Sequence, residues 1–287
     1  MSARQDVPPQ AATWGEGDSS PSFADLDGAP FPAFQPGSVW LVGAGPGAPG
    51  LLTLLAYHAL TQADTVVYDA LVNTDVLGYA RADARRIHAG KRGGKPSAQQ
   101  ADICATLVAE AEAGRRVLRL KGGDPFLFGR GGEECEALRA AGVPFRVVPG
   151  ISSGLGGLAY AGLAATHRTV NQSVTFLTGH DLTGALPTAI DWAGLARAAP
   201  VLVMYMAVKH LPAIATRLIE AGRAADEPVA IVARATLPDQ TMTCTTLADT
   251  AEPHDWPTPA IVVVGGVVPL ADALAWFDAP ASAGLMG

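Results

Sequence analysis

The sequence predicts an α/β protein made of two α/β domains with a cleft between them. Between residues 38 and 150, short apolar runs typical of buried strands alternate with segments of helical spacing, and glycine-rich turns follow several of these runs. After Gly150 the strands become richer in Thr and Val. The alternation predicts a mostly parallel sheet covered by helices on both faces, and the second half predicts a mixed sheet. The cleft is the default ligand site.

Composition narrows the class of protein. The chain has 287 residues, 49% of them hydrophobic and 16% charged, which is enough for a substantial core. Its net charge of -7 argues against general binding to nucleic acid or to a membrane surface. The three cysteines lie far apart, without zinc or disulfide spacing, so we expect no metal and a reducing cytoplasm. The longest apolar stretch, residues 260–270, is too short to span a bilayer.

Four segments follow from the changes in composition. Residues 1–37 are rich in Pro, Gly, Ser and Asp, and their phenylalanines follow no pattern, which is typical of a flexible tail. We expect an N-terminal domain at 38–149, a C-terminal domain at 150–277 and a short tail at 278–287.

The first expected strand begins at Ser38 and leads into a glycine-rich turn. Gly45, Gly47 and Gly50 fit the pattern G-x-G-x-x-G, and Asp69 ends the next apolar run, as in a dinucleotide fingerprint. Two prolines within the turn remove N–H groups that a pyrophosphate would need. An NAD-dependent oxidoreductase therefore remains an alternative on weak evidence.

The remaining elements are expected in chain order. In the first half we expect strands at 65–68, 86–89, 117–120 and 145–148, helices at 51–60, 97–113 and 133–141, and a segment of unassigned type at 75–81. In the second half we expect helices at 151–165 and 211–221, and strands at 173–178, 200–206, 228–233, 239–246 and 260–264. The loops at Gly43, Asp69, Lys91 and Gly122 all follow strands, so they can converge on one crevice.

The loop of residues 116–134 is built for close approach to a ligand. Gly122 and Gly123 offer backbone without side-chain bulk, Asp124 can accept hydrogen bonds, and Arg130 can hold an anion. The alternative is a tight strand-to-helix turn whose polar residues only contact water.

Several motifs in this order resemble the tetrapyrrole methylase family, and within it the uroporphyrinogen-III C-methyltransferases. The motifs are Gly-Ala-Gly-Pro-Gly at 43–47, Val-Tyr-Asp at 67–69, Gly-Lys-Arg at 90–92, the long stretch 119–134, Val-Pro-Gly-Ile at 148–151, Thr-His-Arg at 166–168, Thr-Gly-His at 178–180 and Tyr-Met at 205–206. The resemblance implies a homodimer that transfers methyl groups from S-adenosylmethionine to C2 and C7 of uroporphyrinogen III. The product, precorrin-2, serves siroheme, cobalamin or heme d1 biosynthesis.

The resemblance also implies residue roles. It makes Asp69 the proton acceptor and Lys91 the proton donor, with Arg130 beside the reacting centre. The implied contacts to S-adenosylmethionine, and to its product S-adenosylhomocysteine, are Pro46, Gly122, Gly123, Asp124, Leu127, Ser152, Ser153, Met206, Ala235, Pro259 and Ala260. The implied tetrapyrrole contacts are Arg92, Glu133, His167, Arg168 and His180. Basic residues among these suit a polycarboxylate acceptor.

The chain departs from the family pattern at a few positions. Ala48 stands where the family has an aspartate, and Ala207 and Ala235 replace glycines. Loss of a carboxylate at position 48 leaves open a methylase that is impaired or redirected to another acceptor. A tetrapyrrole-binding protein without turnover is a further alternative.

Overall fold

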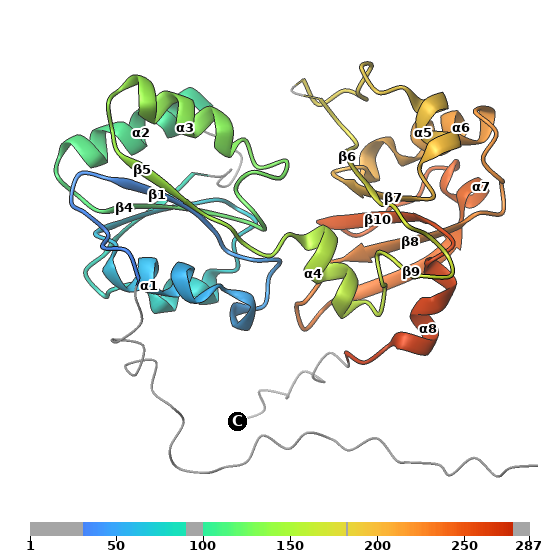
Figure 1. Cartoon of the computed structure of the whole chain (residues 1–287), viewed down its shortest axis with the longest axis horizontal. Helices are drawn as coiled ribbons and strands as arrows, with labels where there is room; N and C mark the ends of the chain where they lie inside the picture. Colours follow the sequence, from blue (N-terminus) through green and yellow to red (C-terminus); the bar gives the residue numbers. More distant parts are fainter. Residues whose placement is uncertain (1–30, 90–99, 182, 278–287) are drawn as a thin grey trace, which may run out of the picture. The chain divides into compact units, whose positions relative to one another are not determined.

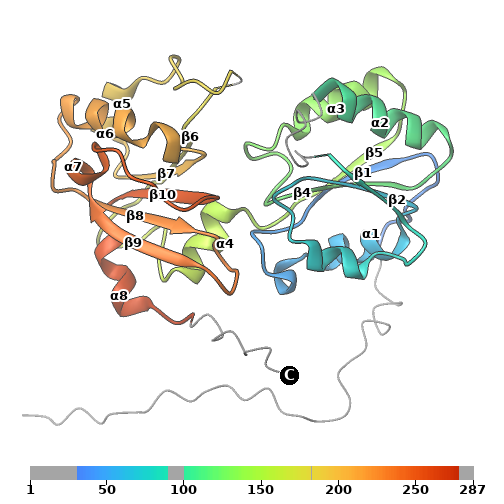
Figure 2. The same cartoon turned by 180° about the vertical axis from the view of Figure 1, so that it is seen from behind.

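Two five-stranded sheets and their covering helices make up the protein (Figures 1 and 2). The structure, a computed structural model, describes residues 31–89, 100–181 and 183–277. From Phe34 onward the described chain belongs to one compact unit by its internal contacts. The α/β class predicted from the sequence is confirmed.

The first sheet is entirely parallel. Its strands are β1 (Val39–Gly43), β2 (Thr65–Tyr68), β3 (Arg85–His88), β4 (Val117–Lys121) and β5 (Phe145–Val148), in the order β3-β2-β4-β1-β5. Parallel strands bring their carboxyl ends to one edge of a sheet, so the turns after β1, β2 and β4 are neighbours.

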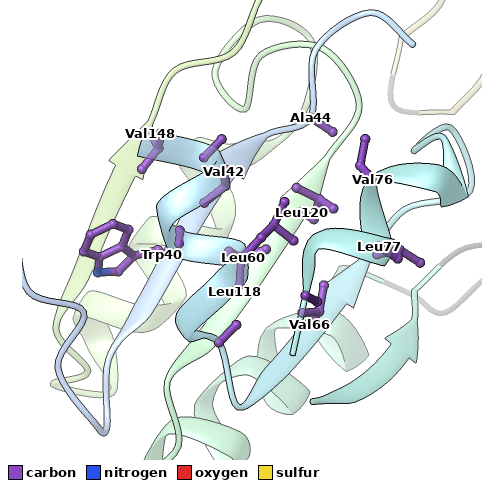
Figure 3. Close-up of a cluster of buried hydrophobic side chains, with 14 of the residues drawn as sticks. Trp40, Val42, Ala44, Leu60, Val66, Val76, Leu77, Leu118, Leu120 and Val148 are labelled. Atoms are coloured by element: carbon purple, nitrogen blue, oxygen red, sulfur yellow. The ribbon is translucent and has the colours of Figure 1, made fainter. Parts of the chain in front are cut away.

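Helices cover both faces of this sheet. One face packs against α1 (Leu54–Gln62) and the 3-10 helix η3 (Thr74–Tyr79), and the core between them contains Leu118 and Leu120 of β4 (Figure 3). The other face packs against α2 (Gln100–Glu112) and α3 (Gly131–Ala140), in a second cluster that includes Val117. Strand alternation therefore turns Arg119 and Lys121 of β4 toward the α2 and α3 side.

The second sheet is mixed, as predicted. Its strands are β6 (Thr175–Thr178), β7 (Val201–Tyr205), β8 (Pro228–Ala233), β9 (Thr241–Thr246) and β10 (Ala260–Gly265), in the order β6-β7-β10-β8-β9. Only β6 and β7 pair in parallel. The last strand in the sequence thus lies in the centre of the sheet.

Short helices cover the second sheet on both faces (Figure 2). One face carries α5 (Trp192–Ala198), α6 (Leu211–Glu220) and α7 (Leu247–Thr250), and the other carries α4 (Ser153–Tyr160) and α8 (Ala271–Leu274). Helix α6 buries Leu211, Ile214, Ala215 and Leu218, the spacing of one helical face. Three further 3-10 helices are η2 (Pro49–Leu51), η4 (Val208–His210) and η5 (Val268–Leu270).

Some elements differ from the sequence-based expectation. Helix α4 spans Ser153–Tyr160 rather than 151–165, because Gly162 adopts a left-handed backbone (φ 68°) just after it. Helix α5 was not predicted, although Asp191 caps it by accepting a hydrogen bond from Gly194 N–H. The segment 75–81 was predicted without a type, and most of it belongs to the 3-10 helix η3, which is capped by Asn73.

The packed part of the chain begins earlier than predicted. Phe34 was placed in the flexible tail, yet it is 3% exposed and stacks on Trp40 with ring centroids 4.5 Å apart. Residues 1–30 lie outside the described residues. The sheets change between Val148 and Ser153, but the boundary between two domains at 149/150 stays a prediction.

Candidate active site

A cavity of about 670 Å³ lies at the carboxyl ends of β1, β2 and β4. Its wall combines the turns after these strands with segments around α4, the ends of β7 and β8, and the start of β10. Every residue predicted to contact S-adenosylmethionine lines this one cavity: Pro46, Gly122, Gly123, Asp124, Leu127, Ser152, Ser153, Met206, Ala235, Pro259 and Ala260. Residues more than two hundred positions apart are thereby brought together, as Pro46 and Pro259 illustrate.

Glycines let the strand-end turns lie against one another. A Cβ added at Gly43 would stand 2.5 Å from both Gly123 O and Gly150 Cα. Gly45 and Gly123 exchange backbone hydrogen bonds, at 3.3 Å and 2.8 Å. A Cβ at Gly43 or Gly150 would overlap the neighbouring turn, so glycine at these two positions lets the turns form the floor of the cavity.

Asp124 holds this floor through both of its carboxylate oxygens. Oδ1 accepts a hydrogen bond from Phe126 N–H (2.8 Å) and Oδ2 accepts one from Gly150 N–H (3.1 Å). The predicted ligand contact is therefore also the residue that ties the β4 turn to the end of β5.

Tyr205 fixes the start of α4 from inside the cavity. Its hydroxyl lies 2.6 Å from Ser152 Oγ and accepts a hydrogen bond from Gly154 N–H (2.9 Å). Burial raises the pKa of Tyr205, although hydrogen bonds from Ser152 and Gly154 oppose that rise. A neutral phenol therefore positions the predicted cofactor contacts Ser152 and Ser153.

A cluster of buried charges lies behind Asp69, the predicted proton acceptor. Arg119 donates a hydrogen bond from Nη2 to Asp69 Oδ1 (2.6 Å) and another from Nε to Glu134 Oε1 (3.0 Å). Lys121 Nζ donates to Glu134 Oε1 (3.0 Å) and stands 3.8 Å from Asp69 Oδ2. The side chains of Arg119, Lys121 and Glu134 are at most 3% exposed, whereas that of Asp69 is 30% exposed. Asp69, Arg119 and Lys121 all line the cavity, and Asp69 is the most exposed of them.

The buried position of Lys121 and its neighbour Arg119 disfavour the positive charge of its ammonium group. Burial and the neighbouring positive charge of Arg119 lower the pKa of Lys121, while Glu134 and Asp69 act in the other direction. Glu134 and Asp69 therefore offset the cost of burying the positive charges of Arg119 and Lys121.

Cations outnumber carboxylates in the cavity lining. Arg119, Lys121, Arg130 and Arg234 line it, against Asp69 and Asp124. Arg130 pairs with Glu133 (2.6 Å) and Arg234 with Asp239 (2.7 Å). The hydrogen bond from Arg130 lowers the pKa of Glu133 and raises that of Arg130. Glu134, Glu133 and Asp239 pair with these cations from outside the lining, so the site offers guanidinium and ammonium donors without an excess of positive charge.

Other predicted substrate residues do not line this cavity. Glu133 lies beside it in the ion pair with Arg130. His167 Nδ1 lies 2.9 Å from Thr169 Oγ1, His180 Nδ1 lies 3.0 Å from Asp181 O, and Arg168 is exposed. Lys91, the predicted proton donor, and Arg92 lie outside the described residues. Their roles stay predictions.

The sequence analysis missed several cavity residues. Arg119 and Lys121 were counted only within an apolar strand and a family motif, and Glu134, Tyr205 and Gln100 received no role. A signal was present for two of them, because strand alternation in Val-Leu-Arg-Leu-Lys puts both cations on one face. Glu134 enters the cluster only through packing of α3, which strand periodicity does not reveal.

Residues with a left-handed backbone conformation are concentrated around the cavity. Among the described residues, five that are not glycine have a positive φ: Phe128, Arg130, Met206, Arg234 and Thr236. The first four line the cavity. Left-handed conformations cost free energy for residues with a Cβ and are concentrated at functional sites.

Ala48 does not line the cavity. It occupies the N-cap position of η2 in an extended conformation, with no side-chain hydrogen bond to the helix. Its N–H donates to Thr236 Oγ1 (2.9 Å). The sequence analysis left open that the missing carboxylate impairs or redirects the methylase; the structure places residue 48 at the N-cap of η2, outside the cavity lining.

Comparison with known proteins identifies the family. The profile described as "Tetrapyrrole (Corrin/Porphyrin) Methylases" matches residues 38–251. The chain belongs to this family. A uroporphyrinogen-III C-methyltransferase of Sinorhizobium sp is 60% identical to this methylase over 255 residues, which cover 88% of the chain and 91% of that relative.

Two further relatives define how far the similarity extends. Siroheme synthase 1 of Yersinia enterocolitica is 49% identical over 84% of the chain, and the chain spans about half (51%) of that longer protein. The crystal structure of uroporphyrin-III C-methyl transferase from Thermus thermophilus, complexed with S-adenosylhomocysteine, matches with a TM-score of 0.70 and 39% identity. That match covers 81% of this chain and 99% of the other.

Family membership and local geometry both oppose the dinucleotide alternative. In a dinucleotide site the glycine turn opens a helix whose N-terminus faces the pyrophosphate. Here the turn leads into the 3-10 helix η2, α1 begins only at Leu54, and Gly50 is outside the cavity lining. The G-x-G-x-x-G pattern and Asp69 therefore belong to the turns after β1 and β2 of a methylase, and not to a dinucleotide site.

Proposed function

We propose that this methylase transfers methyl groups from S-adenosylmethionine to C2 and C7 of uroporphyrinogen III, giving precorrin-2. The observation that carries the proposal is that all the predicted cofactor contacts share one cavity with Asp69. The high identity to a uroporphyrinogen-III C-methyltransferase across nearly its full length supports the choice of acceptor.

The cavity fits a ligand that is partly apolar and carries a few polar groups. Leu127, Met206 and Ala235 offer apolar surface, and the Gly122–Gly123 turn offers open backbone, with Gly123 in a left-handed conformation (φ 65°). We assign the binding of S-adenosylmethionine to this part of the cavity. When bound, it supplies a methyl group on a positively charged sulfur, which is already electrophilic.

The protein then has to orient the acceptor and manage a proton. Asp69 presents a carboxylate oxygen at the cavity wall, and we assign to it the uptake of the proton that the methylated pyrrole ring releases. The basic side chains of the lining, Arg130 among them, can donate hydrogen bonds to the carboxylate side chains of the tetrapyrrole. Proximity of donor and acceptor supplies much of the remaining rate.

The assembly and location follow from the family resemblance. We propose a homodimer in the cytoplasm, with no nucleic-acid or membrane partner. None of the helices in the described ranges is long and apolar enough to cross a membrane. Sedimentation of the purified full chain tests the dimer directly.

The activity is tested by anaerobic incubation of the full chain with uroporphyrinogen III and S-adenosylmethionine. We expect mass spectrometry to show the addition of two methyl groups, and a reaction without S-adenosylmethionine serves as the control. Binding of S-adenosylhomocysteine without any methylated product would exclude uroporphyrinogen III as the acceptor and favour a redirected methylase.

A further inference from the structure

We propose that Arg119 and Glu134 are positioning residues that act through Asp69: Glu134 anchors Arg119, and Arg119 holds the carboxylate of Asp69 in the orientation needed for proton uptake. The inference rests on the proposed function, because it assigns to Asp69 the role of proton acceptor. It adds Arg119, which lines the cavity next to Asp69, and Glu134, which lies behind it, and both act through Asp69.

Hydrogen bonds link Glu134 to Arg119 and Arg119 to Asp69. Glu134, whose side chain is fully buried, receives three hydrogen bonds on one oxygen, from Arg119 Nε (3.0 Å), Lys121 Nζ (3.0 Å) and Gln100 Nε2 (3.1 Å). These bonds fix the guanidinium plane of Arg119, which then donates from Nη2 to Asp69 Oδ1 at 2.6 Å.

The arrangement distinguishes the two oxygens of Asp69. Oδ1 is taken by Arg119, while Oδ2 lies 3.8 Å from Lys121 Nζ, beyond hydrogen-bond distance. Oδ2 therefore retains the capacity to accept a proton. A carboxylate held at one oxygen presents the other in a defined direction, which an isolated aspartate on a turn does not.

A second buried ion cluster in the same sheet provides the comparison. Glu110 of α2 binds Arg85, Arg115 and Thr65 at distances of 2.7 to 2.8 Å, and its side chain is 8% exposed. This cluster lies at the amino end of β2 and contributes no residue to the cavity. Its carboxylate is buried and binds two cations, as Glu134 does, but Arg85 and Arg115 are 63% and 37% exposed, and Glu110 does not bind Asp69.

The test is a pair of double-mutant cycles on the full chain. Arg119→Gln, Glu134→Gln and Asp69→Asn are made singly, and each of the first two is combined with Asp69→Asn. Glu110→Gln is the matched control. For each variant kcat, KM and the dissociation constant of S-adenosylhomocysteine are measured, and crystal structures of Glu134→Gln and Glu110→Gln are determined.

We expect Arg119→Gln to lower kcat about 100-fold, because misplacement of a reacting group by about 1 Å has this effect. Dissociation constants of S-adenosylhomocysteine should stay within about threefold of the native value, because neither Arg119 nor Glu134 is among the predicted cofactor contacts. Within each cycle the double variant should be no slower than Asp69→Asn, since a positioning residue has no effect once its target is removed. Glu110→Gln should keep kcat.

Multiplicative losses in the double variants would overturn the proposal, as would native kcat in both Arg119→Gln and Glu134→Gln. If Arg119→Gln does not fold, the Glu134→Gln cycle decides. The crystal structures decide independently of turnover: we expect the Asp69 carboxylate to turn in Glu134→Gln but not in Glu110→Gln, and an unmoved carboxylate would contradict the inference. Failure of the native chain to methylate uroporphyrinogen III would instead refute the proposed function.

Discussion

Individual residues at the site of this methylase have structural roles that their motifs did not indicate. Asp124 was predicted to contact the cofactor, yet both its oxygens already bind backbone N–H groups that hold the cavity floor. Tyr205 received no role from the sequence, although its hydroxyl positions Ser152 and Gly154. Residue type and motif position indicated which turns form the site. They did not show which side chains support others, because such contacts join residues distant in sequence.

Position 48 gives the prediction that belongs to this scale. We expect Ala48→Asp to stabilise the fold by about 0.5 kcal/mol, since aspartate at the N-cap of η2 can accept a hydrogen bond from the first turn. We expect kcat to stay within about threefold, because residue 48 is not part of the cavity lining. Urea unfolding and steady-state turnover check both. A variant that is much faster than the native chain would restore the view that the missing carboxylate impairs catalysis.

At the scale of elements, periodicity predicted most strands and the longer helices. The five parallel strands of the first sheet lie within a few residues of their expected positions, because apolar runs between glycine turns leave few alternatives. Helix α5 was not predicted, because its seven residues make too few turns for a helical period to be recognised in the sequence. The 3-10 character of η3 depends on capping by Asn73, which hydrophobic spacing does not encode.

Helix α2 supplies a prediction about pH. Burial opposes the ionisation of Glu110, but hydrogen bonds from Thr65 and Arg115 outweigh it, so the pKa of Glu110 is lowered from its ordinary value of 4.5. A lowered pKa in the folded state stabilises the fold above pH 4.5, and this contribution is lost as the pH falls through the folded pKa.

We therefore expect Glu110→Gln to reduce the free energy of unfolding by about 1 to 3 kcal/mol at pH 7, because the variant leaves Arg85 and Arg115 without their carboxylate. The difference between variant and native chain should shrink in acid, below the folded pKa of Glu110. Urea unfolding at a series of pH values measures it. A difference that is independent of pH would show that ionisation of Glu110 does not contribute.

On the scale of the whole molecule, the cavity depends on both sheets. Its wall takes residues from the first sheet, such as Lys121 of β4, and from the second, such as Tyr205 of β7 and Ile261 of β10. A ligand that bridges these segments binds the folded chain and not the unfolded one.

We expect S-adenosylhomocysteine at about 100 times its dissociation constant to add about 2.7 kcal/mol to the free energy of unfolding, seen as a rise in Tm. NADH at the same concentration should leave Tm unchanged, since the glycine turn does not open a helix toward the cavity. Differential scanning calorimetry of the full chain makes the comparison. A rise in Tm with NADH but not with S-adenosylhomocysteine would instead support an NAD-dependent oxidoreductase.

The order of strands in the second sheet also has a consequence for biosynthesis. Strand β10 is made last but lies between β7 and β8, so a nascent chain holds two separate strand pairs, β6-β7 and β8-β9, until residues 260–265 have left the ribosome. Until then the inner edges of β7 and β8 expose unpaired N–H and C=O groups, which favour aggregation. A chain released before that point would have the strands of the first sheet but no central strand in the second. Chaperones would have most to protect in the last stage of synthesis.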